Sequence, residues 1–179
     1  MKGGRQILCD IGVGVYTKEY FAAQTRYQLL GNGSQGHSVP ILDGQYQCAG
    51  KQYAASEVSF ANGCLSMNLL GAYGREGSLV RKFFIGDEGV TLTDAYQLAW
   101  TPKSIVERFV AYECPMVEEG KLVWRDTQMT FDQEQLECKI TKQQYQNNFK
   151  GIFDVWLIDF VLKENNPEQT VRFEIRSMQ

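Results

Sequence analysis

The chain has 179 residues, a formal net charge of −3 and 44% hydrophobic residues. This length is sufficient for one ordinary core, and the hydrophobic content excludes a disordered protein. The acidic balance excludes a sequence-independent nucleic-acid binder, because neutralising phosphates requires surplus Lys and Arg. The longest apolar run, at 155–162, is too short for a membrane span and is broken by Asp159. We therefore expect neither nucleic acid nor a membrane as a partner.

Strand periodicity dominates the sequence. Apolar and polar residues alternate at 65–69, 136–140 and 171–175. This period of two is typical of strands that have one face in a core and the other in solvent. Helical periodicity is weak throughout, and the segment 141–148 is compatible with a helical turn or a loop.

Turn signals separate these runs along the chain. Asp43-Gly44 and Asn62-Gly63 are the strongest, because both dipeptides favour two-residue hairpin turns with positive φ. Further turn signals lie at 86–89, 118–120 and 165–167. The spacing predicts an all-β fold, an antiparallel two-sheet β-sandwich of roughly a dozen strands with little helix. We expect a single domain over residues 1–179.

The cysteine and histidine content limits the chemistry of the chain. The cysteine number is odd, no pair is spaced as Cys-x-x-Cys, and the positions are Cys9, Cys48, Cys64, Cys114 and Cys138. This pattern argues against a zinc knuckle and a full disulfide framework, and predicts small buried side chains with free thiols. His37 is the sole histidine, which excludes a multi-histidine metal site. We expect neither a metal nor another cofactor.

The segment 31–38, Gly-Asn-Gly-Ser-Gln-Gly-His-Ser, is the most unusual in the chain. A phosphate-binding loop would need a helix after it and usually a Lys, whereas here a strand is expected and no Lys is near. Two interpretations of His37 remain. It is either presented at a sheet rim for proton transfer or charge neutralisation, or it is a structural histidine in a flexible turn. The residues alone favour the structural role.

The first half of the chain carries a series of short motifs. Residues 7–17 include Asp10-Ile-Gly, Arg26-Tyr27 follows, and 36–47 reads Gly-His-Ser-Val-Pro-Ile-Leu-Asp-Gly-Gln-Tyr-Gln. This series resembles the C-terminal β-domain of the heparinase II/III-like polysaccharide lyases. The stretches 72–81 and 90–94 also resemble the family, in which a basic residue opens one strand and Asp closes the next. The chain departs from the family at Ser38, where an Asn is usual.

The resemblance implies a function for a longer protein. Family members combine an N-terminal α/α toroid with a C-terminal β-domain that contributes a loop histidine, and they cleave uronate linkages by β-elimination. The chain is thus expected to be the C-terminal part of a lyase whose toroid is absent, and to be inactive alone. Its expected partners are an acidic polysaccharide or oligosaccharide and the missing α/α domain. The parent would be periplasmic or secreted if it carries a signal peptide, and cytoplasmic otherwise.

The resemblance also implies site residues. His37 is the expected catalytic acid/base or charge-stabilising residue, and Tyr73 is a weaker catalytic candidate. Arg26, Arg75 and Arg81 are the expected substrate-binding residues, against the usual explanation of a solvated charged face.

The alternative is a non-catalytic carbohydrate-binding or interaction β-sandwich. Tyr46, Tyr53, Trp100 and Trp124 could then stack on sugars, although most aromatic residues of a sandwich belong to its core. The coding region upstream of Met1 would discriminate the two. A long helical domain there favours the lyase, and an unrelated catalytic domain or none favours the binding module.

Overall fold

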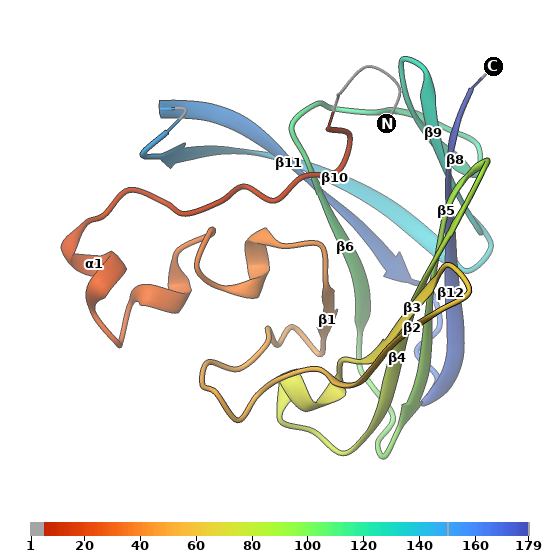
Figure 1. Cartoon of the computed structure of the whole chain (residues 1–179), viewed down its shortest axis with the longest axis horizontal. Coiled ribbons are helices and arrows are strands. Elements are labelled where there is room, and N and C mark those ends of the chain that lie inside the picture. Colours follow the sequence, from red (N-terminus) through yellow and green to blue (C-terminus); the bar gives the residue numbers. More distant parts are fainter. Residues whose placement is uncertain (1–5, 150, 179) are drawn as a thin grey trace. The chain divides into compact units, whose positions relative to one another are not determined.

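The computed structural model describes residues 6–149 and 151–178, and these contain twelve strands. The strands form two antiparallel sheets, one of four strands and one of eight (Figure 1). Within the same residues, helix is limited to one four-residue α-helix and three short 3-10 helices. The prediction of an all-β fold with two antiparallel sheets and little helix is confirmed. Residues 1–5 lie outside the described part.

The chain divides into two compact units, each containing one of the sheets. Unit 1 comprises residues 1–49, 104–114 and 137–162, and unit 2 comprises 50–103, 115–136 and 163–179. Each unit is therefore assembled from segments that are distant in the sequence. The single domain over 1–179 stays a prediction.

The sheet of unit 1 has four strands, in the order β1 (Pro40–Leu42), β6 (Ile105–Ala111), β11 (Gly151–Leu162) and β10 (Leu136–Asn147). Strands β10 and β11 run side by side as a long pair (Figure 1). β11 contains the apolar run that the sequence indicated, and its Val155 and Leu157 are buried with Val110 of β6 in one hydrophobic cluster. Cys9 and Ile11 belong to the same cluster, so the segment 9–11 packs against the sheet through these two side chains.

The segment 141–148, which the sequence left open between a helical turn and a loop, is mostly strand. It forms the end of β10, where Tyr145 and Asn147 are buried two positions apart. The run Thr-Lys-Gln-Gln before Tyr145 is exposed, so the chain shows no polar–apolar alternation there. The strand exists because β11 pairs with it, and that pairing is invisible in the local sequence.

The N-terminal part of unit 1 is irregular. Figure 1 shows it as a winding segment with short helical turns, namely α1 (Lys18–Phe21), η1 (Arg26–Gln28) and η2 (Ser34–Gly36). Leu8 makes an isolated bridge to Ala111, and Cys9 N donates to Val110 O at 2.9 Å. The residues just before the Asp-x-Gly motif therefore form no regular strand and are held by these contacts with the end of β6.

The sheet of unit 2 has eight strands in the order β2 (Ser56–Ala61), β3 (Cys64–Asn68), β4 (Gly77–Gly86), β5 (Gly89–Leu98), β12 (Glu168–Ser177), β9 (Thr127–Phe131), β8 (Lys121–Trp124) and β7 (Met116–Glu118). The short helix η3 (Leu70–Tyr73) links β3 to β4. Five of the seven neighbouring pairs join strands consecutive in sequence, as expected for hairpins.

The two strongest turn signals form the hairpin turns that they predicted. Asn62 and Gly63 have φ values of 51° and 73°, and they join β2 to β3 with Ala61 opposite Cys64. Asp43 and Gly44 have φ values of 54° and 72°. Both central residues are left-handed in each turn, which is the primed geometry that matches the twist of the flanking strands.

Arg81 and Asp94 form a buried ion pair in the middle of the unit 2 sheet. They lie opposite each other on β4 and β5, and Arg81 Nε donates to Asp94 Oδ1 at 2.8 Å. Their side chains are 3% and 0% exposed. The basic residue and the Asp of the family-like stretches 72–81 and 90–94 are thus a cross-strand pair of the fold.

The turn at Asn62-Gly63 yields a stability prediction. Gly63→Val should lower the free energy of unfolding by ~1 kcal/mol or more, because a β-branched residue fits positive φ badly. A Cβ at this position would also lie 3.1 Å from Ile85 O. Ser59→Val, which puts the same residue on exposed β2, should have little effect in the same urea titration. Equal stability of Gly63→Val and the parent chain would contradict the turn assignment.

The buried ion pair yields a second prediction. Arg81→Met should destabilise the chain by ~3–5 kcal/mol, because it leaves the Asp94 carboxylate buried without its partner. The double variant Arg81→Met/Asp94→Leu should recover most of the loss, since it removes both charges. Chemical denaturation of the three proteins measures both effects. A double variant as unstable as the single one would argue against this account.

Candidate functional site

His37 follows directly after η2, in extended backbone with φ −122°. The loop before it is tightly folded, which explains two of its glycines. A Cβ at Gly36 would collide with Leu30 O, and one at Gly31 would collide with the Tyr145 hydroxyl. The glycine-rich segment therefore allows close backbone packing, as expected of Gly, and it leads into β1 rather than into a helix.

The sheet of unit 1 holds this loop through Arg108 of β6. The guanidinium makes two hydrogen bonds to Asp159 of β11, of 2.7 and 2.6 Å, and a third of 2.8 Å to Gln35 O. Burial acts to lower the pKa of Arg108, but the hydrogen bonds and charge of Asp159 outweigh it and raise the pKa overall. Ser38 adds a further tie, because its hydroxyl accepts from Val110 N at 3.1 Å. The histidine thus lies between two anchored positions.

His37 is oriented by Asp10. Its Nδ1 lies 3.1 Å from Asp10 Oδ2, while Asp10 Oδ1 accepts a hydrogen bond of 2.7 Å from Gly12 N. The His37 side chain is 33% exposed and that of Asp10 67%. A carboxylate that engages Nδ1 fixes the ring orientation and leaves Nε2 for another group. The Asp-x-Gly motif therefore supplies both the carboxylate and the turn that aims it.

Two tyrosines of the unit 1 sheet fix the Asp10–Gly12 stretch. Tyr112 donates its hydroxyl to Asp10 O at 2.9 Å, and Tyr145 donates to Gly12 O at 2.7 Å. Burial first, and then the charge of Asp10, raises the pKa of Tyr145 to about 12. The Tyr145 hydroxyl accordingly acts here as a neutral hydrogen-bond donor.

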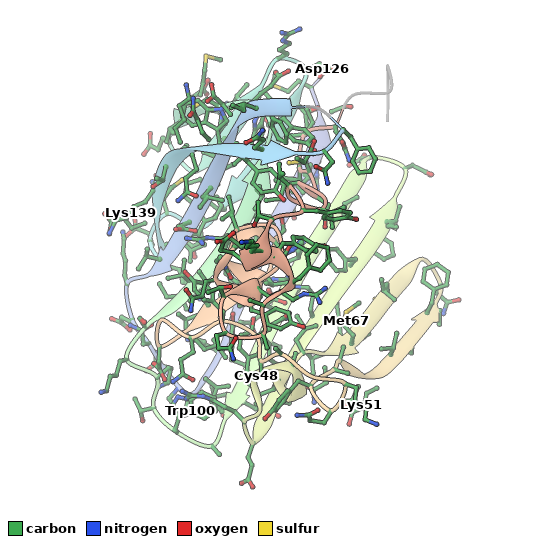
Figure 2. All side chains as sticks on the ribbon, turned by 90° about the vertical axis from the view of Figure 1, so that its left-hand side faces the viewer. Cys48, Lys51, Met67, Trp100, Asp126 and Lys139 are labelled. Atoms are coloured by element: carbon green, nitrogen blue, oxygen red, sulfur yellow. The ribbon has the colours of Figure 1, made fainter. Side chains whose placement is uncertain are left out.

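His37 lines a pocket of about 230 Å³ whose other walls are Tyr27, Asn32, Gly33, Ser34, Gln47, Cys48 and Ala49. Cys48 is exposed and is labelled in Figure 2. Gln47 N donates to Ser34 Oγ at 2.8 Å and so joins two of the walls. The buried Asn32 Nδ2 has no hydrogen-bond partner among the described residues. The pocket is therefore a small space lined mostly by polar residues, with the imidazole of His37 in its wall.

The three predicted arginines differ in the unit to which they belong and in their exposure. Arg26 is exposed in unit 1, next to Tyr27 of the pocket wall. Arg75 is half-buried in unit 2, with its guanidinium 4.5 Å from the centre of the Trp100 ring. Arg81 is buried in its pair with Asp94, so its charge is used within the fold and it has no surface to offer a polysaccharide.

Tyr73 is buried in unit 2 and only 4% exposed. It lies at the end of η3 rather than at a strand edge, and a catalytic role would require it to leave this position. Of the five predicted residues, unit 1 therefore contains His37 and Arg26. Asp10 was noticed in the sequence only as part of an Asp-x-Gly motif, and its pairing with His37 was not predicted. No sequence pattern singled out Asn32, which lines the pocket beside His37.

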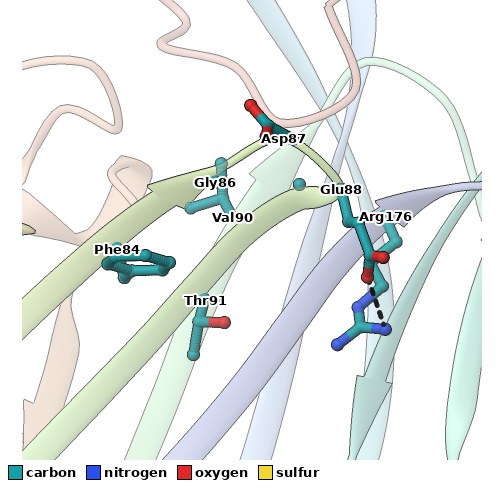
Figure 3. Close-up of a pocket in the computed structure, with 8 residues that line it drawn as sticks. Phe84, Gly86, Asp87, Glu88, Val90, Thr91 and Arg176 are labelled. Carbon is teal, nitrogen blue, oxygen red and sulfur yellow. Dashed lines mark ion pairs between the residues drawn. The ribbon is translucent and has the colours of Figure 1, made fainter. Parts of the chain in front are cut away.

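A larger hollow in unit 2 is a weaker candidate. It has a volume of about 480 Å³ and lies at the β4–β5 turn, between Phe84, Thr91 and Arg176. Figure 3 shows Arg176 facing Glu88, and these side chains form an ion pair of 3.4 Å. Asp87 projects from the tip of the turn in the same view. The only cation in this hollow is already neutralised, and no group suited to proton transfer near neutral pH lines it.

The cysteines agree only in part with expectation. No disulfide joins them, all five lying within the described residues. Cys9 is buried as predicted, but Cys48 and Cys114 are exposed. Burial, and then the charge of Asp159, raises the pKa of Cys138 to about 11, which disfavours its thiolate. Within residues 6–149 and 151–178, no cluster of His, Cys, Asp and Glu could hold a metal ion, and no helix could span a membrane.

Comparison with solved structures extends this picture. The chain is similar to a crystal structure of the heparan sulfate lyase HepC from Pedobacter heparinus, with a TM-score of 0.74 and 16% identity. The match covers 98% of this chain and 29% of that protein. A heparinase III with methylated lysines gives a TM-score of 0.71 and 14% identity, over 98% and 28% of the two chains. The chain has a heparinase-like β-domain fold.

The resemblance to the family is thereby confirmed at the level of the fold. A crystal structure of heparinase III gives a TM-score of 0.54 at 14% identity, again over 98% of this chain and 28% of the other. The chain thus spans less than a third of the length of these proteins. No family model matches the sequence, and no curated protein is similar to it in sequence.

The buried tyrosine yields a prediction on pH. The pKa of Tyr145 is raised in the fold from 10.0 to about 12, so its contribution to stability is present below pH 10 and lost as pH rises towards 12. Tyr145→Phe should cost ~1 kcal/mol at neutral pH, because Gly12 O loses its donor, and should flatten this alkaline decline. Unfolding titrations across this pH range measure both.

Proposed function

We propose that this chain is the β-domain of a polysaccharide lyase that cleaves an acidic, uronate-containing polysaccharide by β-elimination. The observation that carries the proposal is the Asp10–His37 pair, 3.1 Å apart, whose histidine lines a pocket, in a chain with a heparinase-like fold. In this proposal His37 is the residue that the domain contributes to the active site.

The chemistry explains why such a residue is needed. β-Elimination removes the C5 proton of the uronate, breaks the bond to the leaving oxygen at C4, and leaves a C4–C5 double bond. One group must offset the charge that develops on the carboxylate, a base must take the proton and an acid must protonate the leaving oxygen. With Nδ1 turned to Asp10, Nε2 of His37 is the ring nitrogen that would exchange a proton with the sugar or bind its developing charge.

The remaining groups would come from outside the chain. Because the matched lyases are more than three times as long as this chain, we infer an α/α domain that completes the cleft and binds part of the polymer. The chain alone is then expected to lack appreciable lyase activity, since His37 supplies only one of the required groups.

The proposal predicts the effect of removing the imidazole. In the full-length parent protein, His37→Ala should lower the turnover of a uronate-containing polymer by roughly a hundredfold or more, as expected for loss of a general acid/base. Its melting temperature should stay nearly unchanged, because the side chain is partly exposed. Ultraviolet absorbance of the unsaturated product follows the reaction.

Two further variants sharpen this experiment. Asp10→Asn should lower turnover less than His37→Ala, because it disturbs the orientation of the ring but keeps the ring. Lys139→Ala, at an exposed residue of β10 labelled in Figure 2, should have no effect. Full activity of His37→Ala would refute the catalytic assignment and favour the carbohydrate-binding alternative.

A further inference from the structure

An exposed aromatic cluster lies on and beside α1 in unit 1. The ring centres of Tyr16, Tyr20 and Phe21 are 4.8 to 5.5 Å apart, each ring contacting the other two. Tyr20 is buried, whereas Tyr16 is 58% and Phe21 65% exposed. Mutual contact restricts the rotation of these rings, so two aromatic surfaces are presented to solvent at little further entropic cost on binding.

The backbone that carries the cluster is well tied. The Thr17 side chain caps α1 by accepting from Tyr20 N at 3.3 Å, and Thr25 donates its hydroxyl to Glu19 O at 2.8 Å. Hydrogen bonds to its own backbone N–H and to Thr17 lower the pKa of Glu19. The one carboxylate of the helix is therefore engaged with the helix cap.

Arg26 places a positive charge at the edge of the cluster. Its guanidinium carbon lies 5.5 Å from the centre of the Tyr20 ring and 5.6 Å from that of Tyr27. Arg26 is exposed, and among the described residues no carboxylate pairs with it. The two rings hold the cation by cation–π attraction and leave its N–H donors for an outside group.

Tyr27 connects this cluster to the candidate site. It is in contact with Arg26 on one side and forms part of the wall of the His37 pocket on the other. The exposed rings, the cation and the pocket therefore follow one another along unit 1. A polymer that places one sugar at His37 can place a neighbouring sugar along this surface.

We propose that Tyr16, Phe21 and Arg26 form a saccharide-binding subsite beside the His37 pocket, specific for an acidic sugar. The rings of Tyr16 and Phe21 are tilted by 59° to each other, so one pyranose face stacks on one ring and the sugar edge contacts the other. The carboxylate or sulfate of the sugar binds the guanidinium, whose fork matches such anions. The inference rests on the proposed function in one respect, namely that the bound polymer runs from this subsite towards His37. The binding itself requires no catalysis, so it can be tested separately.

The test is calorimetric titration of the 179-residue chain with a heparan sulfate hexasaccharide and with a neutral chitin hexasaccharide. Phe21→Ala and Tyr16→Ala should each weaken binding of both probes by roughly tenfold, the loss expected for one stacked ring. Arg26→Gln should weaken binding of the acidic probe by a similar factor but leave the neutral probe unaffected.

Phe149→Ala is the matched control, because Phe149 is an aromatic residue of unit 1 with 82% exposure that is not part of the cluster. It should bind both probes as the parent chain does. Equal losses in Phe149→Ala and Phe21→Ala, or no binding by the parent chain, would overturn the subsite. Unchanged sugar affinity in Phe21→Ala, with a full-length protein that becomes sensitive to proteolysis, would instead identify the cluster as a contact with another domain. Turnover of the full-length protein tests the role of His37, whereas sugar binding by the 179-residue chain tests the subsite. Failure of one proposal can therefore be told from failure of the other.

Discussion

The loop that carries His37 is tied to the sheet of unit 1 through Arg108. The loop that carries the histidine has almost no sheet pairing of its own. Several of its carbonyls accept from N–H groups of the loop itself, and the Gln35 carbonyl is satisfied by a side chain of the sheet. Arg108 does this at Gln35 O while it is fixed by two hydrogen bonds to Asp159. A half-buried arginine is stable there because the carboxylate offsets the cost of its desolvation. The Arg108–Asp159 ion pair thus gives the loop a fixed attachment to the sheet.

Much of the fold could be predicted, because strands and two-residue turns leave local signatures. Asn62-Gly63 specifies its hairpin through its own backbone preference, and β11 is visible as an apolar run. The end of β10 could not be predicted, since it is a strand only through its pairing with β11. Arg81 was expected at the surface for the same reason. Its partner Asp94 is distant in the sequence and becomes its neighbour only when β4 pairs with β5.

The candidate site shows the same limit. His37 could be singled out because it is the sole histidine and follows an unusual loop. The role of Asp10 as its partner depends on a contact across 27 residues, and the aromatic cluster around Phe21 has no spacing that distinguishes it from core residues. The net charge of the chain also failed to predict the local charge near the candidate site. An acidic chain can still present an exposed, unneutralised Arg26 beside its pocket, because charge acts locally at physiological ionic strength.

The interleaving of the two units has a consequence for how the protein is made. Each sheet draws its strands from the beginning, the middle and the end of the chain, with changes of unit after residues 49, 103, 114, 136 and 162. During synthesis, neither unit can close before its last segment leaves the ribosome, and non-local pairing of this kind folds slowly. The His37 loop therefore waits for β11 and its Asp159, which arrive more than a hundred residues later. The candidate site is thus assembled among the last parts of the molecule, and a truncation that removes β11 should release the His37 loop.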